Sequence, residues 1–374
     1  MISMIKRELK LEDSIKKGKV LLLMGARRVG KTTLVDNFLT QSGEKYIKYD
    51  GTDMKVQEIF SYANIDHLSG YLDGYDILAI DEAQNIKNIG QTLKLIVDSR
   101  PNLKVIATGS SSFDLMGQVG EPLVGRKISC FLFPISVAEY IVDNKLKYEQ
   151  KLPSMLIYGM YPNVLTSQNN TDKTEFLNEL VNSLLLKDIL TFQEVKGSDI
   201  LFRLLQLLAF QLGSEVSMEE LGNKLSISKN TVVRYLDLLE KAYVIFRLSG
   251  FSRNLRSEID KKAKYYFYDN GVRNALISNF NPLASRDDVG KLWENFAIVE
   301  RMKMRKYRKI SANQYFWRTW SQKEIDLIEE RDGQLFAYEF KYADTAKAPT
   351  EFTETYPNSK FEAINKDNFL DFVS

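Results

Sequence analysis

The stretch LLLMGARRVGKTTLV (residues 21–35) decides the fold of the first part of the chain. It opens with a short, continuous apolar run, which is typical of a strand buried on both faces of a parallel sheet. The loop that follows, from Gly25 to Thr32, has the pattern G-x-x-x-x-G-K-T, and an amphipathic segment comes after it. A strand, a glycine-rich loop and a helix in this order form the context in which that pattern binds phosphate. The stretch therefore predicts a phosphate-binding loop at the carboxyl end of a buried strand.

The residues of this loop have distinct expected roles. Gly25 and Gly30 allow backbone N–H groups to point at phosphate oxygens. Lys31 should reach the β- and γ-phosphates of ATP, and Thr32 should bind Mg²⁺. We expect the nucleotide to contact Gly25, Ala26, Arg27, Arg28, Val29, Gly30, Lys31, Thr32 and Thr33. The alternative, a glycine-rich turn that binds nothing, does not explain the flanking strand and helix.

Two further apolar runs end in polar residues. DILAI (residues 76–80) precedes the acidic pair Asp81 and Glu82. We expect Asp81 to hold Mg²⁺ with its waters, and Glu82 to orient or deprotonate the attacking water. KVIA (residues 104–107) precedes a hydroxyl cluster, from which one group, Ser110 foremost, should sense the γ-phosphate; a plain serine-rich turn is the alternative. The cluster comprises Thr108, Ser110 and Ser111.

Composition narrows the classes of function. The 374 residues suffice for two or three domains, and 44% of them are hydrophobic, as in ordinary globular proteins. The single cysteine, Cys130, excludes an internal disulfide framework, and the single histidine, His67, leaves little room for histidine metal sites or Ser/His triads. The formal net charge of +2 neither supports nor excludes nucleic acid. Catalysis must therefore rest on carboxylates, lysines and backbone groups.

The sequence indicates neither export nor a membrane anchor. Its N-terminal segment is charged throughout and has no apolar core of signal-peptide length. No stretch reaches the ~18 apolar residues that span a bilayer. With the single cysteine, these features predict a cytoplasmic protein without a membrane partner.

The order of expected elements predicts different folds along the chain. Strands alternate with helices up to about Tyr140, which is typical of a doubly wound α/β domain whose ligand lies at the carboxyl ends of the strands. Helical periodicity follows. Then MEELGNKL (residues 218–225) and the segment from Lys229 predict a helix-turn-helix with a β-wing. A helix and several strands end the chain, with RDG (residues 331–333) as a hairpin turn.

A series of short motifs runs along nearly the whole chain: GARRVGKTT, AIDEAQ, ATGSSS, LVGR, FPISVAEY, YGMYPNVL, LLKDIL, YFYDNGVRNAL, ENFAIVE, EIDLIEE and YEFK. The series resembles that of a bacterial and archaeal family of AAA+-type P-loop ATPases. The resemblance implies an ATPase domain at 1–145, a helical lid or linker at 146–210, a winged helix at 211–280 and a restriction-endonuclease-like α/β domain of the PD-(D/E)XK type at 281–374. The cellular role of the family is largely unassigned, so the resemblance predicts architecture better than biology.

The resemblance also adds Arg126, in LVGR, as an arginine finger that acts in cis or from a neighbouring subunit. The second case implies a homo-oligomer. The alternative is a surface arginine that pairs with a nearby acid. We interpret Arg27 and Arg28 as residues beside the nucleotide or at a subunit interface, and not as catalysts.

The second helix of the expected helix-turn-helix has polar and basic residues where a recognition helix contacts DNA. These are Lys229, Asn230, Thr231 and Arg234. Basic residues continue through the wing, where contacts to the phosphates of DNA or RNA would lie: Arg247, Arg253, Arg256, Lys261, Lys262 and Lys264. Acids intrude at Glu240, Glu258 and Asp260. Because winged helices also bind proteins, a protein-interaction module is the alternative.

Asp326 in EIDLIEE and Glu339-Phe340-Lys341 in YEFK form a D…E-x-K pattern. Residues two apart on a strand share a face, and the adjoining hairpin strand can bring Asp326 beside them. Carboxylates there would bind a second Mg²⁺ or an Mn²⁺, and Lys341 would polarise water. The resemblance adds Glu294 as a further acid of this site. The alternative is an acidic hairpin with a Glu–Lys pair, since the pattern is short.

Three classes of function follow. The first is an ATP-driven, nucleic-acid-associated machine with a metal-dependent nuclease tail. The second is a nucleotide-switched regulator or protein-interaction scaffold with an inert nuclease-like domain, and the third is an ATPase that remodels protein substrates. The intact Glu82 favours turnover over a pure switch. Trp317 and Trp320 could stack on bases near the tail site, although aromatic residues more often belong to cores.

Overall fold

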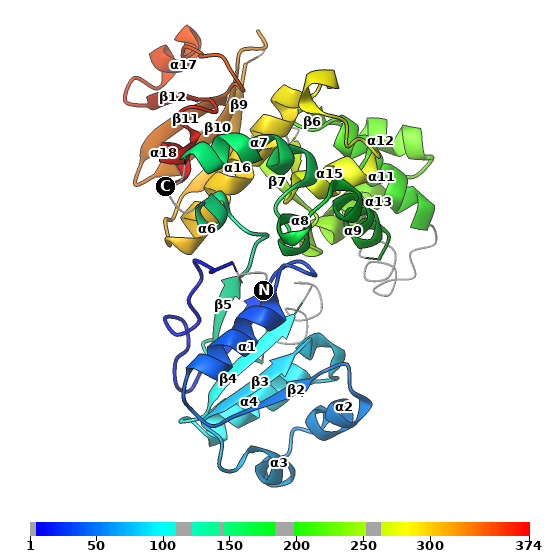
Figure 1. The fold of residues 1–374 in the computed structure, drawn as a ribbon, viewed down its shortest axis with the longest axis vertical. Coiled ribbons are helices and arrows are strands. Elements are labelled where there is room, and N and C mark those ends of the chain that lie inside the picture. Colours follow the sequence, from blue (N-terminus) through cyan, green and yellow to red (C-terminus); the bar gives the residue numbers. More distant parts are fainter. Residues whose placement is uncertain (1–4, 110–121, 142–144, 184–197, 252–262, 320) are drawn as a thin grey trace. The chain divides into compact units, whose positions relative to one another are not determined.

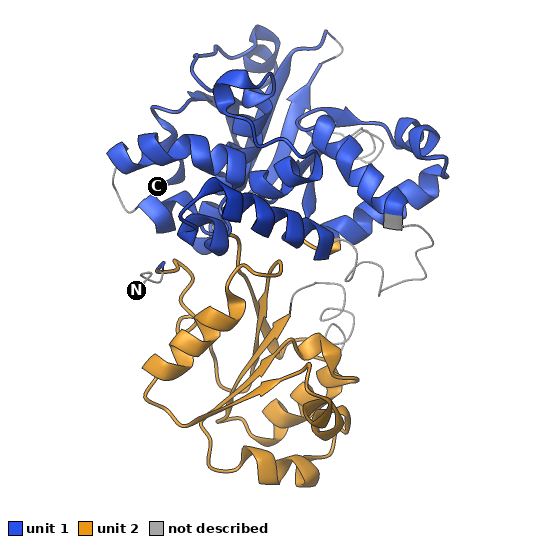
Figure 2. Ribbon diagram, turned by 45° about the vertical axis from the view of Figure 1, so that its right-hand side comes forward, with its two compact units in different colours: residues 1–5, 135–240, 244–374 blue, residues 6–134, 241–243 orange. Residues whose placement is uncertain are grey.

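The computed structural model of the protein describes residues 5–109, 122–141, 145–183, 198–251, 263–319 and 321–374. Two compact units divide the chain (Figure 2). The N-terminal unit comprises residues 6–134 with 241–243, and the C-terminal unit comprises residues 1–5, 135–240 and 244–374. The phosphate loop belongs to the first unit and the D…E-x-K hairpin to the second, so the two expected sites lie in different units.

A five-stranded sheet of order β2-β3-β4-β1-β5, parallel throughout, forms the centre of the N-terminal unit (Figure 1). Its strands are β1 (Val20–Met24), β2 (Tyr46–Asp50), β3 (Ile77–Asp81), β4 (Lys104–Gly109) and β5 (Lys127–Phe131). The helical segments are α1 (Lys31–Gln41), α2 (Met54–Ser61), α3 (Ile65–Leu72), the 3-10 turn η1 (Ala83–Asn85) and α4 (Ile89–Ser99). Strands and helices alternate, which confirms the predicted α/β unit with a parallel sheet.

The central strands of this sheet are apolar because both of their faces are covered. Every residue of β3 is buried. On one face, Phe60, Leu72 and Leu93 of α2, α3 and α4 join a core with alternate residues of β1, β3 and β4. Since β4 lies between β1 and β3, the ends of these three strands meet at one edge of the sheet. That edge is where the phosphate loop and the acidic pair begin.

A seven-stranded mixed sheet of order β12-β11-β10-β9-β7-β8-β6 runs through the C-terminal unit. Its strands are β6 (Glu215–Val216), β7 (Ile245–Gly250), β8 (Ala263–Phe267), β9 (Asn313–Arg318), β10 (Glu324–Arg331), β11 (Gln334–Phe340) and β12 (Lys360–Ile364). The pairing of β7 with β9, where Ser249 is opposite Tyr315, joins strands from both sides of the expected boundary at residue 281 into one sheet.

The helical segments between and around these strands are α6 (Val137–Ile141), α7 (Lys145–Tyr158), α8 (Pro162–Thr166), α9 (Asn170–Ser183), α11 (Ser198–Phe210), α12 (Met218–Leu225), α13 (Lys229–Lys241), α15 (Asn270–Leu276), η3 (Leu283–Ser285), α16 (Val289–Tyr307), α17 (Thr350–Thr355) and α18 (Phe369–Val373). Within the described part of the chain, no helix has both the length and the apolar composition needed to cross a bilayer.

The helix pair expected at residues 218–241 is formed by α12 and α13. Ser217 caps α12, and its Oγ accepts a hydrogen bond of 3.3 Å from Glu220 N. Ser226 ends the helix in the left-handed conformation, with φ 57°. Gly222 packs against the turn after α12. A Cβ on Gly222 would come 2.8 Å from Ile227 O, which is too close for a side chain. Antiparallel β7 and β8 follow the pair.

The predicted hairpin of β10 and β11 is also present, and the strands pair antiparallel. Asp332 and Gly333 form its turn with φ values of 48° and 78°. Two positive φ values are typical of the type I′ turn that closes two-residue hairpins. On the other side of β10, the register with β9 shifts between Ile325 and Ile328. Asp326 lies within this irregularity, and irregularities of this kind commonly bend a strand and redirect its side chains.

Trp317 belongs to the core of the C-terminal unit. Its side chain is 7% exposed and packs on Phe352 with ring centroids 5.1 Å apart. The structure thus favours a packing role for Trp317 over base stacking. Trp320 lies outside the described residues.

Candidate nucleotide site and the C-terminal carboxylate cluster

Two glycines shape the loop between β1 and α1. Gly25 has φ 152°, and a Cβ there would come 2.2 Å from Leu132 O. Gly30 has φ 96° and precedes the first residue of α1. Glycine adopts such conformations without steric cost. The loop consequently closes over the start of α1, where the first N–H groups of a helix have no intrahelical partner and favour an anion.

Lys31 points its ammonium group into this loop. The residue is 5% exposed, and its Nζ donates hydrogen bonds of 2.9 Å to Gly25 O and to Ala26 O. A phosphate oxygen is a stronger acceptor for an ammonium group than a neutral carbonyl. Lys31 is therefore placed to exchange these bonds for a bound phosphate.

Asp81 connects the loop to the neighbouring strands. Its Oδ2 accepts a hydrogen bond of 2.7 Å from Thr32 Oγ1, and its Oδ1 accepts a short hydrogen bond from Thr108 Oγ1. Asp81 is 8% exposed. Hydroxyl and carboxylate oxygens are the hard ligands that Mg²⁺ prefers. Thr32 and Asp81 thus fit the Mg²⁺ ion that accompanies ATP.

Glu82 leaves β3 in a left-handed conformation, with φ 47°. Its N–H donates to Thr108 Oγ1 at 3.1 Å, and its Oε2 accepts a hydrogen bond of 2.5 Å from Gln84 Nε2. Backbone packing is close here, because a Cβ on Gly51 would come 2.5 Å from Glu82 O. Such strained conformations concentrate at functional sites. Gln84 was not among the predicted site residues, although it lies in the motif AIDEAQ.

Arg126 lies far from the phosphate loop of its own chain. It precedes β5, whose first residue, Lys127, is opposite Val20 at the start of β1. The loop follows the other end of β1, a strand of 5 residues and hence about 16 Å long. Arg126 Nε instead lies 2.5 Å from Asp98 Oδ1, with both side chains 42% exposed. The expectation of an arginine finger in cis is therefore corrected: parallel pairing puts Arg126 at the opposite edge of the sheet, and the predicted alternative, a surface ion pair, is present.

The other predicted loop residues contribute in different ways. Ala26 and Val29 are 5% and 0% exposed, so their side chains are buried and a ligand of the loop would meet only their backbone groups. Arg7, which sequence patterns did not single out, donates from its two Nη atoms to Val29 O at 2.8 Å and to Phe133 O at 2.6 Å. Arg7 thus links the phosphate loop at Val29 to the segment after β5 at Phe133. The expected sensor Ser110 and its neighbour Ser111 lie outside the described residues.

In the C-terminal unit, the predicted cluster is partly assembled. Burial, and then the charges of Glu294 and Glu339, raise the pKa of Asp326 well above its usual range. Lys341 Nζ donates a hydrogen bond of 2.8 Å to Glu339 Oε1, and Asp326 Oδ2 accepts one of 2.9 Å from Phe340 N. The described hydrogen bonds thus join Glu339 to Lys341, and Asp326 of β10 to the backbone of β11.

A second cation beside these acids is Lys264 of β8. It is 1% exposed, donates a short hydrogen bond to Glu324, and lies 3.5 Å from Glu294 Oε1. Tyr266 OH donates to the same Glu294 oxygen at 2.6 Å. Lys264 was expected on the basic wing as a phosphate contact. That expectation is wrong, because a fully buried ammonium group with two carboxylate partners does not meet an external phosphate.

These contacts also decide how well the cluster fits a metal. In the ranges that the structure describes, no three His, Cys, Asp or Glu side chains form a group that could hold a metal ion. Glu294 Oε1 already accepts a hydrogen bond from Tyr266 OH and lies 3.5 Å from Lys264 Nζ, and Asp326 Oδ2 accepts one from the backbone. The predicted second Mg²⁺ or Mn²⁺ site at Glu294, Asp326 and Glu339 therefore does not fit this arrangement.

The predicted recognition helix is only partly basic at its surface. Lys229 Nζ lies 2.6 Å from Glu219 Oε1, and Lys224 pairs with Glu220 at 2.7 Å. Arg234 lies over the ring of Tyr235 at 5.6 Å. The four wing residues Arg253, Arg256, Lys261 and Lys262 lie outside the described residues. The described part of this face thus mixes cations with paired acids.

Family comparisons divide the chain into three segments. An AAA domain matches residues 17–141. A domain of unknown function (DUF8612) matches residues 149–283, and a further domain of unknown function (DUF4143) matches residues 289–368. The AAA match spans the whole parallel sheet with the phosphate loop and the acidic pair.

The related curated proteins are themselves uncharacterized. One from Mycobacterium tuberculosis is 26% identical over 341 residues, covering 90% of this chain and 73% of its own. Another, from Methanocaldococcus jannaschii, is 21% identical over 383 residues, covering 95% of this chain and 82% of its own. A solved structure described as "Structural Basis for Katanin Self-Assembly" is 17% identical with a TM-score of 0.26, covering 59% of this chain and 71% of that chain. Such a TM-score carries no argument about fold. The chain thus contains an AAA-type P-loop domain at residues 17–141 and a DUF4143 domain at residues 289–368.

Proposed function

We propose that the protein binds Mg-ATP at the loop from Gly25 to Thr32 and hydrolyses it. The observation that carries this proposal is the 2.7 Å hydrogen bond from Thr32 Oγ1 to Asp81 Oδ2, which joins the loop to the acidic strand. These two oxygens form the pair to which a nucleotide-bound Mg²⁺ attaches in P-loop proteins. When bound, the ion neutralises charge that develops on the phosphates. The AAA domain match supports the same assignment.

Three side chains of the protein, those of Lys31, Glu82 and Gln84, carry out the other steps of binding and hydrolysis. Lys31 leaves the carbonyls of Gly25 and Ala26 and donates to the β- and γ-phosphates. Glu82 orients the attacking water and accepts its proton, because it is the carboxylate next to the metal ligand Asp81. Gln84 holds the Glu82 carboxylate through its Nε2. Each role uses a group that lies at the carboxyl edge of the parallel sheet.

A steady-state ATPase assay on the full chain tests the proposal. We expect phosphate release that requires Mg²⁺ and that Lys31→Ala abolishes. Lys55→Ala is the matched control, since Lys55 is an exposed lysine of α2 in the same unit. Turnover without Mg²⁺, or undiminished turnover in Lys31→Ala, would contradict the assignment.

A second candidate function is a nucleotide-switched regulator or scaffold whose nuclease-like domain is inert. The observation that favours it is the buried ammonium group of Lys264 beside Glu294 and Glu324. The charge of Lys264 balances the negative charge of these carboxylates, so no metal ion is required to do so. Incubation with DNA and RNA in Mg²⁺ or Mn²⁺ tests it, and no cleavage is expected. Cleavage that Asp326→Ala removes would instead establish the nuclease tail.

A nucleic-acid-associated role is a separate proposal, supported by the helix pair α12–α13 and by the exposed Arg247 of β7. It predicts that DNA or RNA stimulates ATP hydrolysis. The test compares turnover with either polymer and without polymer. Equal turnover in all three cases would favour the regulator or the protein-remodelling alternative.

A further inference from the structure

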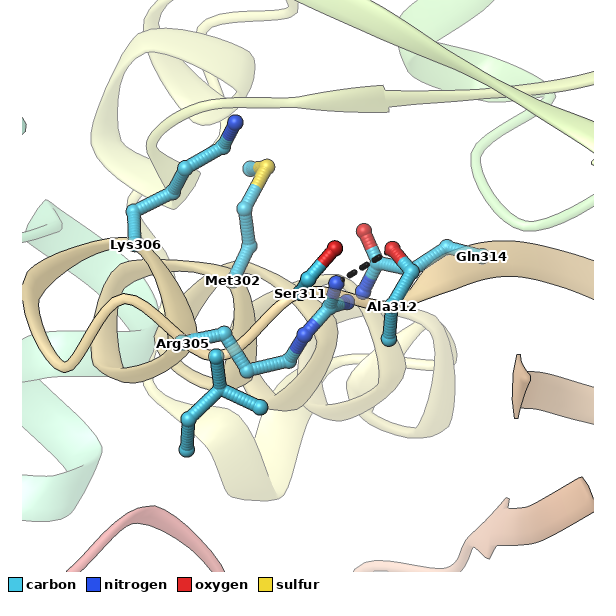
Figure 3. A pocket seen from close by; sticks show the side chains of 7 residues that line it. Met302, Arg305, Lys306, Ser311, Ala312 and Gln314 are labelled. Atoms are coloured by element: carbon cyan, nitrogen blue, oxygen red, sulfur yellow. Dashed lines mark hydrogen bonds between the residues drawn. The ribbon is translucent and has the colours of Figure 1, made fainter. Parts of the chain in front are cut away.

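A small cavity lies in the C-terminal unit where α16 ends and β9 begins (Figure 3). Its volume is about 120 Å³. A water needs roughly 10–15 Å³ by this kind of measure, so the cavity has room for several waters or for a small ion. The residues that matter for its chemistry are Met302, Arg305, Lys306, Ser311, Ala312 and Gln314.

Two side chains of this cavity have N–H groups that the described protein leaves without acceptors. The side chain of Arg305 is 8% exposed, and its Nη2 donates to Ala312 O at 2.6 Å, the bond dashed in Figure 3. Its Nη1 lies 3.4 Å from Glu329 Oε1, but its buried Nε has no hydrogen-bond partner in the described part of the chain, and neither has Nε2 of Gln314. Native structures rarely leave buried donors in this state, because each such group destabilises the fold. The cavity therefore lacks an acceptor.

The charges of Arg305, of the groups beside it and of Lys306 indicate which sign the acceptor has. The buried carboxylate of Glu329 is shared by several guanidinium groups. They belong to Arg301, Arg305 and Arg331, at 3.2, 3.4 and 3.3 Å. One carboxylate does not balance these cations, and Lys306 adds another at the cavity wall. The excess positive charge favours an anion.

The helix dipole explains only part of this arrangement. Arg305 and Lys306 stand in the last turn of α16, where cations stabilise a helix end. The last carbonyls, however, already accept hydrogen bonds: Met304 O from Arg308 N and Arg305 O from Ile310 N, both at 2.9 Å. The dipole thus accounts for the position of the two cations, but not for the unsatisfied N–H groups of Arg305 and Gln314, two residues that line the cavity.

We infer that the cavity between Arg305, Lys306 and Gln314 is a binding site for a small oxyanion of the phosphate type. A guanidinium group and an amide donate in fixed directions, which suits an anion with several acceptor oxygens. Free inorganic phosphate and the terminal phosphate of a short nucleotide chain share this chemistry. The site is in a different unit from the phosphate loop and does not depend on the proposed ATPase activity.

Equilibrium dialysis of radiolabelled inorganic phosphate against the full chain tests the site. The chain carries Lys31→Ala, so that the phosphate loop does not contribute. We expect one phosphate bound per chain, and Gln314→Leu and Lys306→Gln should each weaken binding about tenfold, the effect of losing one charge-assisted hydrogen bond. Lys309→Gln is the matched control, an exposed lysine two residues past α16 that does not line the cavity. Arg305 is left intact because it also pairs with Glu329.

Competition then distinguishes the two sources of the anion. A 5′-phosphorylated thymidine dinucleotide that displaces phosphate, when the unphosphorylated dinucleotide does not, identifies a terminal phosphate as the ligand. Failure of both to compete identifies the free ion. The inference is overturned if the Lys31→Ala chain takes up no phosphate at millimolar concentration, or if Gln314→Leu and Lys306→Gln bind it as well as Lys309→Gln.

Discussion

Thr32 Oγ1 lies 2.7 Å from Asp81 Oδ2, so the first turn of α1 is in direct contact with the end of β3. The two residues are 49 positions apart in the chain. A hydroxyl that donates to a carboxylate holds both oxygens close together before a metal arrives. These two oxygens would hold the Mg²⁺ of the proposed Mg-ATP complex, because hydroxyl and carboxylate oxygens are the ligands that this ion prefers.

The first prediction concerns the carboxylate of this pair. Asp81→Asn should raise the Mg²⁺ concentration needed for half-maximal ATP hydrolysis at least tenfold, because a neutral amide is a poorer Mg²⁺ ligand than a carboxylate. A magnesium titration of turnover measures it. Asp66→Asn, an exposed position on α3, serves as the control. An unchanged titration curve would remove Asp81 from the metal site.

Glu82→Gln separates binding from chemistry. The variant should retain ATP but hydrolyse it about 10²-fold more slowly or worse, since only the group that orients the water is changed. Gln84→Ala should lose less, because it frees the Glu82 carboxylate without removing it. Filter binding with ATP and single-turnover kinetics measure the two steps. Turnover at the original rate in Glu82→Gln would move the base to another residue.

Arg126 tests whether subunits share a site. The pair with Asp98 is at the edge of the sheet opposite the loop, so Arg126→Ala should leave turnover unchanged at concentrations where the chain is monomeric. Its effect on the free energy of unfolding should stay below about 1 kcal/mol, as for other exposed ion pairs. Turnover against protein concentration, with size-exclusion chromatography, is the measurement. A large loss confined to assembled chains would establish a finger acting in trans.

Lys264 should be a strong determinant of stability. Lys264→Met leaves Glu294 and Glu324 without their shared cation, and we expect a loss of about 3 kcal/mol in urea unfolding, the lower end for broken buried pairs because Glu324 is 27% exposed. Lys291→Met, an exposed position on α16, is the control. Mn²⁺ should restore part of the lost stability in Lys264→Met and leave the parent protein unchanged. A variant as stable as the parent would mean that the acids are neutral without Lys264.

Gly25 should tolerate no side chain. Gly25→Ala combines an unfavourable φ of 152° with a Cβ 2.2 Å from Leu132 O, so the loop has to move or the fold is lost. We expect a destabilisation above the roughly 1 kcal/mol that a left-handed φ costs by itself, together with loss of ATP binding. Gly43→Ala isolates that smaller effect, because Gly43 has φ 69° and open space around it. Equal losses in the two variants would argue against the close contact at Leu132.

The sequence alone determined the features that depend on neighbouring residues. The pattern from Gly25 to Thr32 defines the phosphate loop because backbone dihedrals and the start of a helix are local properties. The strands on either side of RDG (residues 331–333), now β10 and β11, and the turn between them were likewise predicted. In each case the interacting groups lie within a few residues of one another, so their spacing in the chain sets their spacing in the molecule.

Only the tertiary structure decided which distant residues meet. Arg126 lies in the motif LVGR, which suggested an arginine finger. Parallel pairing of β5 with β1 instead puts it at the edge of the sheet opposite the phosphate loop. Lys264 belongs to a basic run, yet the sheet that joins β8 through β7 to β9 and β10 turns it toward Glu324, 60 residues later. Strand order and register set such contacts. They result from packing over the whole unit, and no local pattern of residues encodes them.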